Sequence, residues 1–417
     1  MTRVLTVLPA MPLPATAGLQ LRMMEELQIV RALGCHTTVL AFQTEDDDPG
    51  AERLSTLCDE AIAGGPRVPH HAFSTTERAQ QRLQFVYNAL RHRRGDIYPL
   101  SVRYDRMGAE DVVAEAVART KPDFVILPSF LSHYAPVVAR AGSGTVIDAA
   151  DVLSGLTRAF VREYGARNPL KLPGLVANRL AARAQERLFL PDVDEIWCTW
   201  EPEVARLAVT SGNRHVIVVP NAIPASSISP SRLPDRPIVG FIGTYAYTPT
   251  LDAAIMLVDD VLPLLRVLAP EVRVRLAGTG MPAGIEQRLS LTPNVQVMGP
   301  VGDAAGFVAG CRVMALPVRR PGGVPFKLIE AMAAQRPVVA TSALASGLEF
   351  PSGQALLIAD SPRELADAIQ LVLSDNELAT RLASDARRAF EQELSTEAVT
   401  ARLTASSVLA GRPHAAE

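Results

Sequence analysis

A lysine and a glutamate lie three residues apart in the stretch of this sequence with the clearest chemical potential. Lys327 and Glu330 follow the glycine pair Gly322-Gly323, and Pro325 marks the first turn of a predicted helix. The N-terminus of a helix offers free N–H groups and a positive partial charge, which suit a phosphate group. Residues three apart share one helix face, so this ammonium and carboxylate could hold a diphosphate and a ribose. An ordinary surface ion pair fits the same spacing, and the pattern alone leaves both open.

The predicted helix needs strands on either side to position it. One apolar run ends at Pro317 and another covers 337–340, so the glycine pair lies in a strand-to-helix loop. Glycines let the backbone approach a ligand closely. In open parallel sheets ligands bind at the carboxyl ends of the strands, which is where this loop lies.

The composition bounds the kind of protein. The chain has 417 residues, of which 48% are apolar and 20% charged, with a formal net charge of −3. That is enough apolar content for two or three domains. The near-neutral charge and 5% aromatic content argue against a nucleic-acid partner.

Short apolar runs alternate with helical stretches along most of the chain, which is typical of parallel sheets covered by helices. The expected fold class is therefore α/β. The predicted strands cover 3–8, 37–42, 124–127, 145–147 and 195–199, then 238–242, 272–276, 295–298, 313–317, 337–340 and 355–358.

A Ser- and Pro-rich stretch at 225–237 separates the two runs of alternation and reads as a linker. We expect a first α/β domain over 1–224 and a second over 238–394. Residues 395–417 form a helical tail that we expect to pack back on the first domain.

The cysteines and the hydropathy indicate the compartment. The four cysteines form no Cys-x-x-Cys pair, so we expect no disulfide, no metal site and a reducing, cytoplasmic location. We interpret the apolar start of the chain as a first strand rather than a signal peptide. No uncharged run approaches the length of a membrane-spanning helix.

A basic stretch at 156–190 holds seven basic residues against two acidic ones. A solvated helix face explains this bias. The alternative is a surface that attracts an anionic substrate or anionic lipid, which would place the protein peripherally at the inner membrane face.

Several segments resemble family-four retaining glycosyltransferases. The runs 326–333 and 336–341 resemble the donor-site signature of that family, and 241–252 resembles the glycine turn that opens its second domain. Weaker similarities cover 194–199, 218–223 and 9–22. The resemblance implies a GT-B fold, in which two Rossmann-like domains face each other across a deep cleft. The domain over 1–224 would bind the acceptor, and the domain over 238–394 would bind the nucleotide-sugar.

The resemblance also implies a reaction. It is the hexosyltransferase-like transfer of a sugar from a nucleotide-diphosphate-sugar to a small-molecule, glycan or lipid-linked acceptor, with retention of the anomeric configuration. The nucleotide-sugar would be a co-substrate, and no metal or other cofactor is expected. Glu330 would bind the ribose, while Lys327 and the helix start would bind the diphosphate. The donor-binding residues implied are Glu330, Lys327, Gly322, Gly323, Gly243, Thr244, Val301 and Leu328.

In the first domain, Gly18 and Arg22 would form an acceptor or phosphate loop. The candidate catalytic residues are Lys327, His133, which follows a predicted strand, and Asp151. The run 146–151 resembles a region in which the family often has a histidine, whereas this chain has Ala150 there. Gly322 stands where many members have a second glutamate. The alternatives are a nucleotide-sugar epimerase or phosphorylase on the same fold, or a non-catalytic nucleotide-sugar-binding protein.

Overall fold

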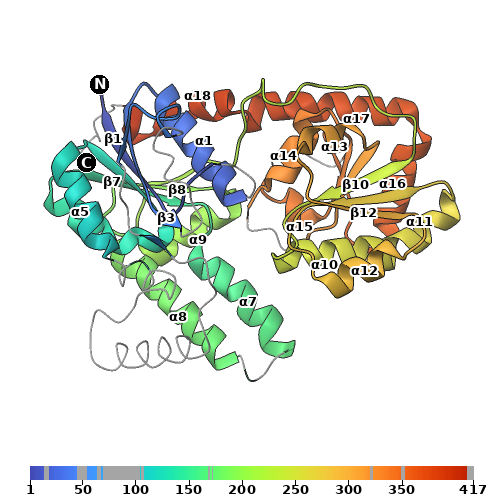
Figure 1. Cartoon of the computed structure of the whole chain (residues 1–417), viewed down its shortest axis with the longest axis horizontal. Coiled ribbons are helices and arrows are strands. Elements are labelled where there is room, and N and C mark those ends of the chain that lie inside the picture. The colour runs from blue at the N-terminus through green and yellow to red at the C-terminus, as the bar shows by residue number, and fades with distance from the viewer. Residues whose placement is uncertain are drawn as a thin grey trace. The chain divides into compact units, whose positions relative to one another are not determined.

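The computed structural model divides the chain into two compact units. Unit 1 comprises Met1–Pro220 and Thr400–Glu417, and unit 2 comprises Asn221–Val399. The structure describes residues 1–13, 18–44, 54–62, 67–68, 104, 108–167, 170, 172–319, 323–348 and 353–410. Figure 1 labels the helices and strands of both units, and each unit is described by itself.

Unit 1 is built on a parallel sheet whose seven described strands run in the order β4-β2-β1-β6-β7-β8-β9. The six residue pairs between β1 and β2 run from Arg3↔His36 to Leu8↔Ala41. Both strands are almost continuously buried, as expected when helices cover both faces of a parallel sheet. The strands are β1 (Arg3–Leu8), β2 (His36–Ala41), β4 (Glu60–Ile62), β6 (Phe124–Pro128), β7 (Gly144–Ala149), β8 (Glu195–Cys198) and β9 (Val216–Val218).

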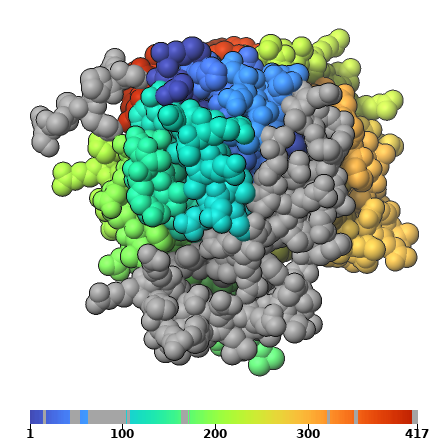
Figure 2. Space-filling view, turned by 60° about the vertical axis from the view of Figure 1, so that its left-hand side comes forward, coloured from blue at the N-terminus to red at the C-terminus, as the bar shows by residue number. Residues whose placement is uncertain are grey.

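Helices follow the strands of unit 1 in alternation, and two more short strands, β3 (Gln43–Thr44) and β5 (Arg67–Val68), pair with each other. The helices are α1 (Gly18–Ala32), α5 (Ala109–Thr120), η1 (Ser129–Tyr134), α6 (Ala135–Arg140), α7 (Leu153–Arg167), α8 (Leu172–Phe189) and α9 (Glu201–Ser211). Helices α7 and α8 extend beyond the sheet as an antiparallel pair, and the teal residues of α5 form part of the outer surface of the unit (Figures 1 and 2). We call α7 and α8 the helical hairpin.

Unit 2 repeats the same architecture with a parallel sheet of six described strands in the order β12-β11-β10-β13-β14-β15. The strands are β10 (Ile238–Ile242), β11 (Arg273–Ala277), β12 (Val295–Gly299), β13 (Val313–Leu316), β14 (Val338–Ala340) and β15 (Leu357–Ile358). The expected α/β class with two parallel sheets is thus confirmed, and the predicted interdomain cleft stays a prediction.

The helices of unit 2 lie between these strands and after them. They are α10 (Thr248–Met256), the π-helical η3 (Leu257–Val261), α11 (Leu262–Leu268), α12 (Ala283–Ser290), α13 (Ala304–Ala309), α14 (Phe326–Ala333), α15 (Ser342–Ala345), α16 (Pro362–Ser374), α17 (Asn376–Ala389) and the π-helical η4 (Phe390–Leu394). Helix α18 (Thr396–Ser406) begins in unit 2 and continues into unit 1 from Thr400. Helix α16 begins with a capping box between Ser361 and Glu364, which satisfies two N–H groups at its start.

The chain returns to unit 1 through the end of α18 and the short helix η5 (Val408–Ala410). Glu195 on β8 anchors this return. Its carboxylate accepts hydrogen bonds from Trp197 Nε1 (2.6 Å), Ser407 Oγ (2.7 Å) and the Val408 N–H (2.9 Å). Glu195 is only 2% exposed, so these three donors replace the water that the carboxylate loses on burial.

In the part of the chain that the structure describes, no helix has the length and apolar character needed to cross a membrane.

Candidate active site

Helix α14 carries the lysine and glutamate singled out in the sequence. Its apolar residues, among them Leu328, Ile329 and Met332, are fully buried in the core of unit 2. Lys327 and Glu330 lie on the opposite, half-buried face, as their spacing predicts. Pro325 precedes the helix in extended conformation, and no side chain caps the helix start. Among the described residues no partner engages the N–H groups of Phe326 and Lys327, which are therefore available to a ligand, whereas the Leu328 N–H donates to the Pro325 carbonyl.

The Lys327 ammonium is held by residues from β10 and α10. It donates a hydrogen bond to Thr250 Oγ1 at 3.1 Å and lies 4.9 Å from the centre of the Phe241 ring. Burial lowers the pKa of Lys327 to about 8, although the nearby Glu330 carboxylate acts in the opposite direction. A half-buried cation whose hydrogen-bond partner among the described residues is the neutral Thr250 favours a bound anion.

Gly243, directly after β10, makes room for this ammonium. A Cβ atom there would lie 2.8 Å from Lys327 Nζ and 2.9 Å from Thr250 Cγ2. Real Cβ atoms do not approach neighbours within 3.0 Å, so any side chain at 243 would displace the lysine. The absence of a side chain at Gly243 therefore places Lys327, and donor binding by the Gly243 backbone stays a prediction.

A second glycine, Gly278, packs against the backbone of Gly243. Gly278 has φ +132°, and a Cβ there would lie 1.8 Å from the Gly243 carbonyl oxygen, so two loop backbones meet at this point. The Gly243 N–H donates to the Ala277 carbonyl at 3.0 Å, which fixes the turn to the end of β11.

Glu330 is the carboxylate closest in sequence to Lys327. Burial raises its pKa to about 7, and Lys327 counteracts this shift. Within the described residues no hydrogen bond or ion pair engages the carboxylate. An acceptor that is half-buried and unoccupied can receive hydrogen bonds from the hydroxyls of a ligand.

The other predicted donor-binding residues lie around these groups or outside the described residues. Gly323 has φ +151°, a conformation that favours glycine, and Gly322 lies outside the described residues. Thr244 and Val301 follow the ends of β10 and β12. The Leu328 side chain lies in the core and its N–H donates to the Pro325 carbonyl, so it offers little to a ligand.

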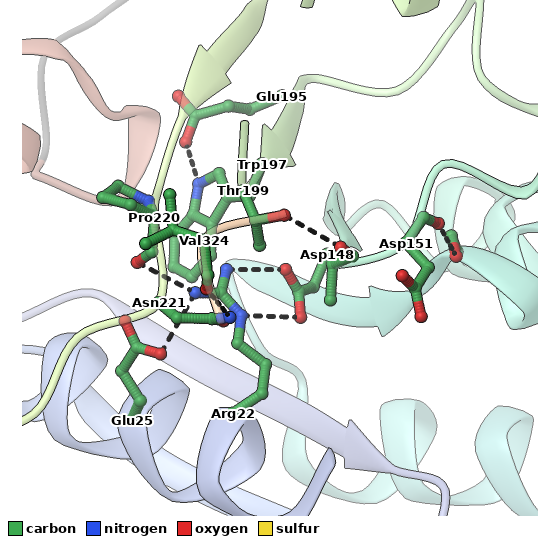
Figure 3. Close-up of polar contacts among 12 residues, drawn as sticks. Arg22, Glu25, Asp148, Asp151, Glu195, Trp197, Thr199, Pro220, Asn221 and Val324 are labelled. Carbon is green, nitrogen blue, oxygen red and sulfur yellow. Dashed lines mark hydrogen bonds and ion pairs between the residues drawn. The ribbon is translucent and has the colours of Figure 1, made fainter. Parts of the chain in front are cut away.

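Asn221 is a residue of this region to which sequence reasoning gave no role. Its Nδ2 donates a hydrogen bond of 2.8 Å to the Val324 carbonyl, one residue before Pro325 (Figure 3). The two residues are 103 positions apart, so no local pattern indicates the contact. Asn221 thereby fixes the loop that leads into α14.

In unit 1, Arg22 lies at the centre of a buried ionic network (Figure 3). Its Nε and Nη2 donate to Asp148 at 3.2 and 2.8 Å, and its Nη1 donates to Glu25 Oε2 at 3.2 Å and to the Pro220 carbonyl at 3.3 Å. Arg22 is 3% exposed. Burial raises the pKa of the neighbouring Glu26 well above its usual value.

The resemblance implied an acceptor or phosphate loop with Gly18 and Arg22, whereas the Arg22 guanidinium donates all its described hydrogen bonds to groups of unit 1. Burial of an arginine guanidinium without a charged partner costs free energy, because the group loses its hydration. The carboxylates of Asp148 and Glu25 compensate for this loss and explain why Arg22 can be buried. Gly18 begins α1, and a Cβ there would meet nothing within 4 Å, so no close approach requires a glycine at this position.

The two other candidate catalytic residues follow neighbouring strands of the unit 1 sheet. His133 lies in η1 after β6, with its ring centre 4.0 Å from that of Tyr134. Asp151 follows β7, and its carbonyl accepts a hydrogen bond from Ser129 Oγ at 3.3 Å. Desolvation raises the pKa of Asp151 to about 6, with a further contribution from Asp148. Such a carboxyl can exchange a proton near neutral pH.

Among the residues that the structure describes, no group of three or more His, Cys, Asp or Glu side chains is arranged to hold a metal ion.

One protein-family model matches part of the second unit. Residues 236–375 match the family described as glycosyl transferases group 1, a range that begins just before β10 and ends just after α16. No curated protein matches the chain.

Solved structures match almost the whole chain at low sequence identity. Sucrose-phosphate synthase from Thermosynechococcus elongatus aligns with a TM-score of 0.70 at 15% identity, over 97% of this chain and 98% of that one. Anabaena HepE in complex with UDP-glucose aligns with a TM-score of 0.63 at 15% identity, over 97% and 99%. S. aureus TarM in complex with Fondaparinux, alpha-GlcNAc-glycerol and UDP aligns with a TM-score of 0.65 at 11% identity, over 99% and 100%. The chain has the GT-B fold of these proteins.

Proposed function

We propose that this glycosyltransferase, whose residues 236–375 form a glycosyl transferases group 1 domain, moves a sugar from a nucleotide-diphosphate-sugar to a hydroxyl acceptor. The observation that carries the proposal is the position of Lys327 and Glu330 on one face of α14. Gly243 leaves the space that the Lys327 ammonium occupies. The free N–H groups at the start of α14 lie one turn from Glu330.

These groups suit the two halves of a nucleoside diphosphate. The Lys327 ammonium and the helix start would bind the diphosphate and stabilise the charge that develops as it leaves. The Glu330 carboxylate would accept hydrogen bonds from the two ribose hydroxyls, which are stronger because the acceptor is charged.

We propose that the sugar is transferred with retention of its anomeric configuration. The bond from the anomeric carbon to the diphosphate oxygen breaks, and a bond from that carbon to the acceptor oxygen forms on the same face. The acceptor hydroxyl gives its proton to the departing diphosphate oxygen. Lys327 would lower the energy of this step by neutralising the remaining phosphate charge.

The compared proteins support the class of co-substrates. HepE was solved with UDP-glucose and TarM with UDP and an alpha-GlcNAc-glycerol. For this chain a UDP-sugar donor and a glycan or lipid-linked acceptor form part of the proposal.

The buried, free thiols of all four cysteines fit a reducing compartment. We therefore place the protein in the cytoplasm, with peripheral membrane contact through 156–190.

Thermal unfolding with a panel of UDP-, GDP- and ADP-sugars tests the donor site. The native donor should raise the melting temperature in a concentration-dependent way, and Lys327→Ala should remove most of the rise. A panel without any stabilising nucleotide would contradict the proposal.

Product analysis by NMR then tests the reaction. Transfer with a retained anomer supports it, and an inverted anomer refutes the mechanism. Conversion of the donor without an acceptor would identify an epimerase, and donor binding without turnover would identify a binding protein.

A further inference from the structure

The helical hairpin of unit 1 exposes several large apolar side chains. Leu170, between the two helices, is 98% exposed. On α8, Leu172, Val176 and Leu180 are 37%, 38% and 60% exposed, and they repeat every four residues. This spacing places the three side chains in one stripe along the helix.

The same face of α8 changes character along its length. Leu172, Val176 and Leu180 occupy the half nearer the turn of the hairpin, over about 12 Å at 1.5 Å per residue. Arg183 and Arg187 continue the line over about the next 10 Å and are exposed. The exposed side chains therefore form an apolar band followed by a cationic band, and the half-buried Arg179 lies between Val176 and Leu180 within the apolar band.

Contacts on the inner face hold α8 in this orientation. Gln185 Nε2 donates to the carbonyl oxygens of Ser129 and Phe130 at 3.3 and 3.1 Å. The Glu186 carboxylate accepts the Ser154 N–H at 2.9 Å, at the start of α7. Because both residues are buried, the banded face cannot turn inward without breaking these bonds.

The exposed arginines of the hairpin form no ion pair within the described residues, although the carboxylates of Glu203 and Glu186 interact electrostatically with Arg158 and Arg183. Arg158 and Arg162 on α7 are exposed as well, and no ion pair engages these two or Arg183 and Arg187 within the described ranges. The segment 156–190 carries seven basic residues and two acidic ones in a chain whose net charge is −3. Positive charge is thus concentrated where the apolar side chains are exposed.

We propose that the hairpin docks on an anionic membrane, with the band of Leu172, Val176 and Leu180 among the acyl chains and Arg183 and Arg187 at the lipid phosphates. A membrane surface has the matching order, because an apolar layer lies beneath an anionic one. Arginine stems can lie along the apolar layer while their guanidinium groups reach the phosphates. The proposal extends the peripheral contact proposed above, and it depends on the hairpin rather than on sugar transfer.

A second copy of the chain fits this face poorly. Parallel pairing of two α8 helices would place Arg183 and Arg187 against the same residues of the other copy. Antiparallel pairing would place arginines against Leu172 and Val176, which leaves the charges without partners.

Vesicle flotation with the full chain tests the proposal. Binding should require phosphatidylglycerol and should weaken at high salt, because the attraction between charges is screened. Arg183→Gln with Arg187→Gln should weaken it about 25-fold, at about 5-fold for each arginine. Leu172→Gln with Leu180→Gln should weaken it by at least 10-fold. The matched control, Val267→Gln with Leu291→Gln, removes two exposed apolar side chains from unit 2 and should bind normally.

A fluorescent label tests the depth of each band. All four native cysteines are buried, and burial raises their thiol pKa values, so a cysteine introduced at Val176 or Arg187 should react selectively. On anionic vesicles the fluorescence emission of the label at 176 should shift to shorter wavelength and should be quenched by quenchers placed within the bilayer. The emission of the label at 187 should show neither change.

The remaining outcomes would overturn the proposal. If the protein binds phosphatidylcholine vesicles as tightly as anionic vesicles, the arginines do not contribute to binding. If the labels at 176 and 187 lie at the same depth in the bilayer, the proposed order of the two bands is wrong. Failure to bind vesicles, with a dimer that Leu172→Gln and Leu180→Gln dissociate, would make this face an interface between copies. Turnover of a water-soluble donor and acceptor by these variants should equal that of the wild type. A loss of that turnover would concern the proposed function instead.

Discussion

Replacing Gly243 by alanine should impair the donor site without unfolding unit 2. The new Cβ would lie 2.8 Å from Lys327 Nζ, whereas ordinary van der Waals contacts begin at 3.4 Å. The ammonium would have to move by about 0.6 Å, which is the difference between these distances. The move stretches its 3.1 Å bond to Thr250 Oγ1 and takes it away from the position that a phosphate requires.

The size of the effect follows from that displacement. A misplacement of about 1 Å in a catalytic site can reduce the rate by about 100-fold. We therefore expect kcat/KM for the donor to fall by about 10- to 100-fold in Gly243→Ala. The free energy of unfolding should fall by about 1–3 kcal/mol, because the Lys327 ammonium can move aside but Thr250 Cγ2, 2.9 Å from the new Cβ, belongs to a buried β-branched side chain. Initial rates of product formation and urea unfolding measure the two quantities.

Gly284→Ala is the matched control, since a Cβ at that position on α12 meets nothing within 4 Å. It should retain the kinetics and the stability of the wild type. If Gly243→Ala keeps normal donor kinetics while Lys327→Ala is impaired, the missing side chain at 243 is not what places the lysine. If both glycine variants lose activity equally, the effect does not come from the site.

The remaining predictions concern the same site. Lys327→Ala should reduce donor turnover by about 10- to 150-fold, as expected for a hydrogen bond to a charged group, with an unchanged circular dichroism spectrum; normal donor kinetics would remove the phosphate assignment. Donor affinity measured by calorimetry should fall in the order wild type, Glu330→Gln, Glu330→Ala, and a donor analogue without ribose hydroxyls should be insensitive to both changes. Donor affinity should peak between about pH 7 and 8, because Glu330 is ionised above its raised pKa and Lys327 is protonated below its lowered pKa; a flat profile from pH 6 to 9 would contradict the assignment. Asn221→Asp removes the N–H group that donates to Val324 and should raise the donor KM about 10-fold with little change in kcat, whereas an unchanged KM would show that the loop needs no anchor.

Patterns within short stretches of the sequence are sufficient to predict most of the strands that the structure shows. The apolar runs at 238–242 and 313–317 correspond to β10 and β13, because a strand covered on both faces needs apolar residues at nearly every position. The positions of Lys327 and Glu330 on one face of α14 follow from helical geometry in the same way. Patterns within one element are sufficient for both results.

Contacts between distant residues were beyond such reasoning. The family resemblance placed Arg22 in an acceptor or phosphate loop, and nothing near it in sequence indicates its partner Asp148, which lies 126 residues away. Thr250, the partner of Lys327, is 77 residues away. These pairs meet only because the strand order brings the ends of separate strands together, and a single sequence does not state that order.

The anchoring of Ser407 and Val408 to Glu195 has a consequence for the order of events during protein synthesis. Unit 1 contains both the earliest residues of the sequence and residues from 400 onward, whereas unit 2 is continuous from 221 to 399. A ribosome therefore finishes all of unit 2 before it supplies two of the three donors to the Glu195 carboxylate. Until then, burial of the Glu195 carboxylate in the nascent first unit costs free energy, because two of its hydrogen-bond donors are missing. We therefore expect the unit that is synthesised first to be the last to complete its folding.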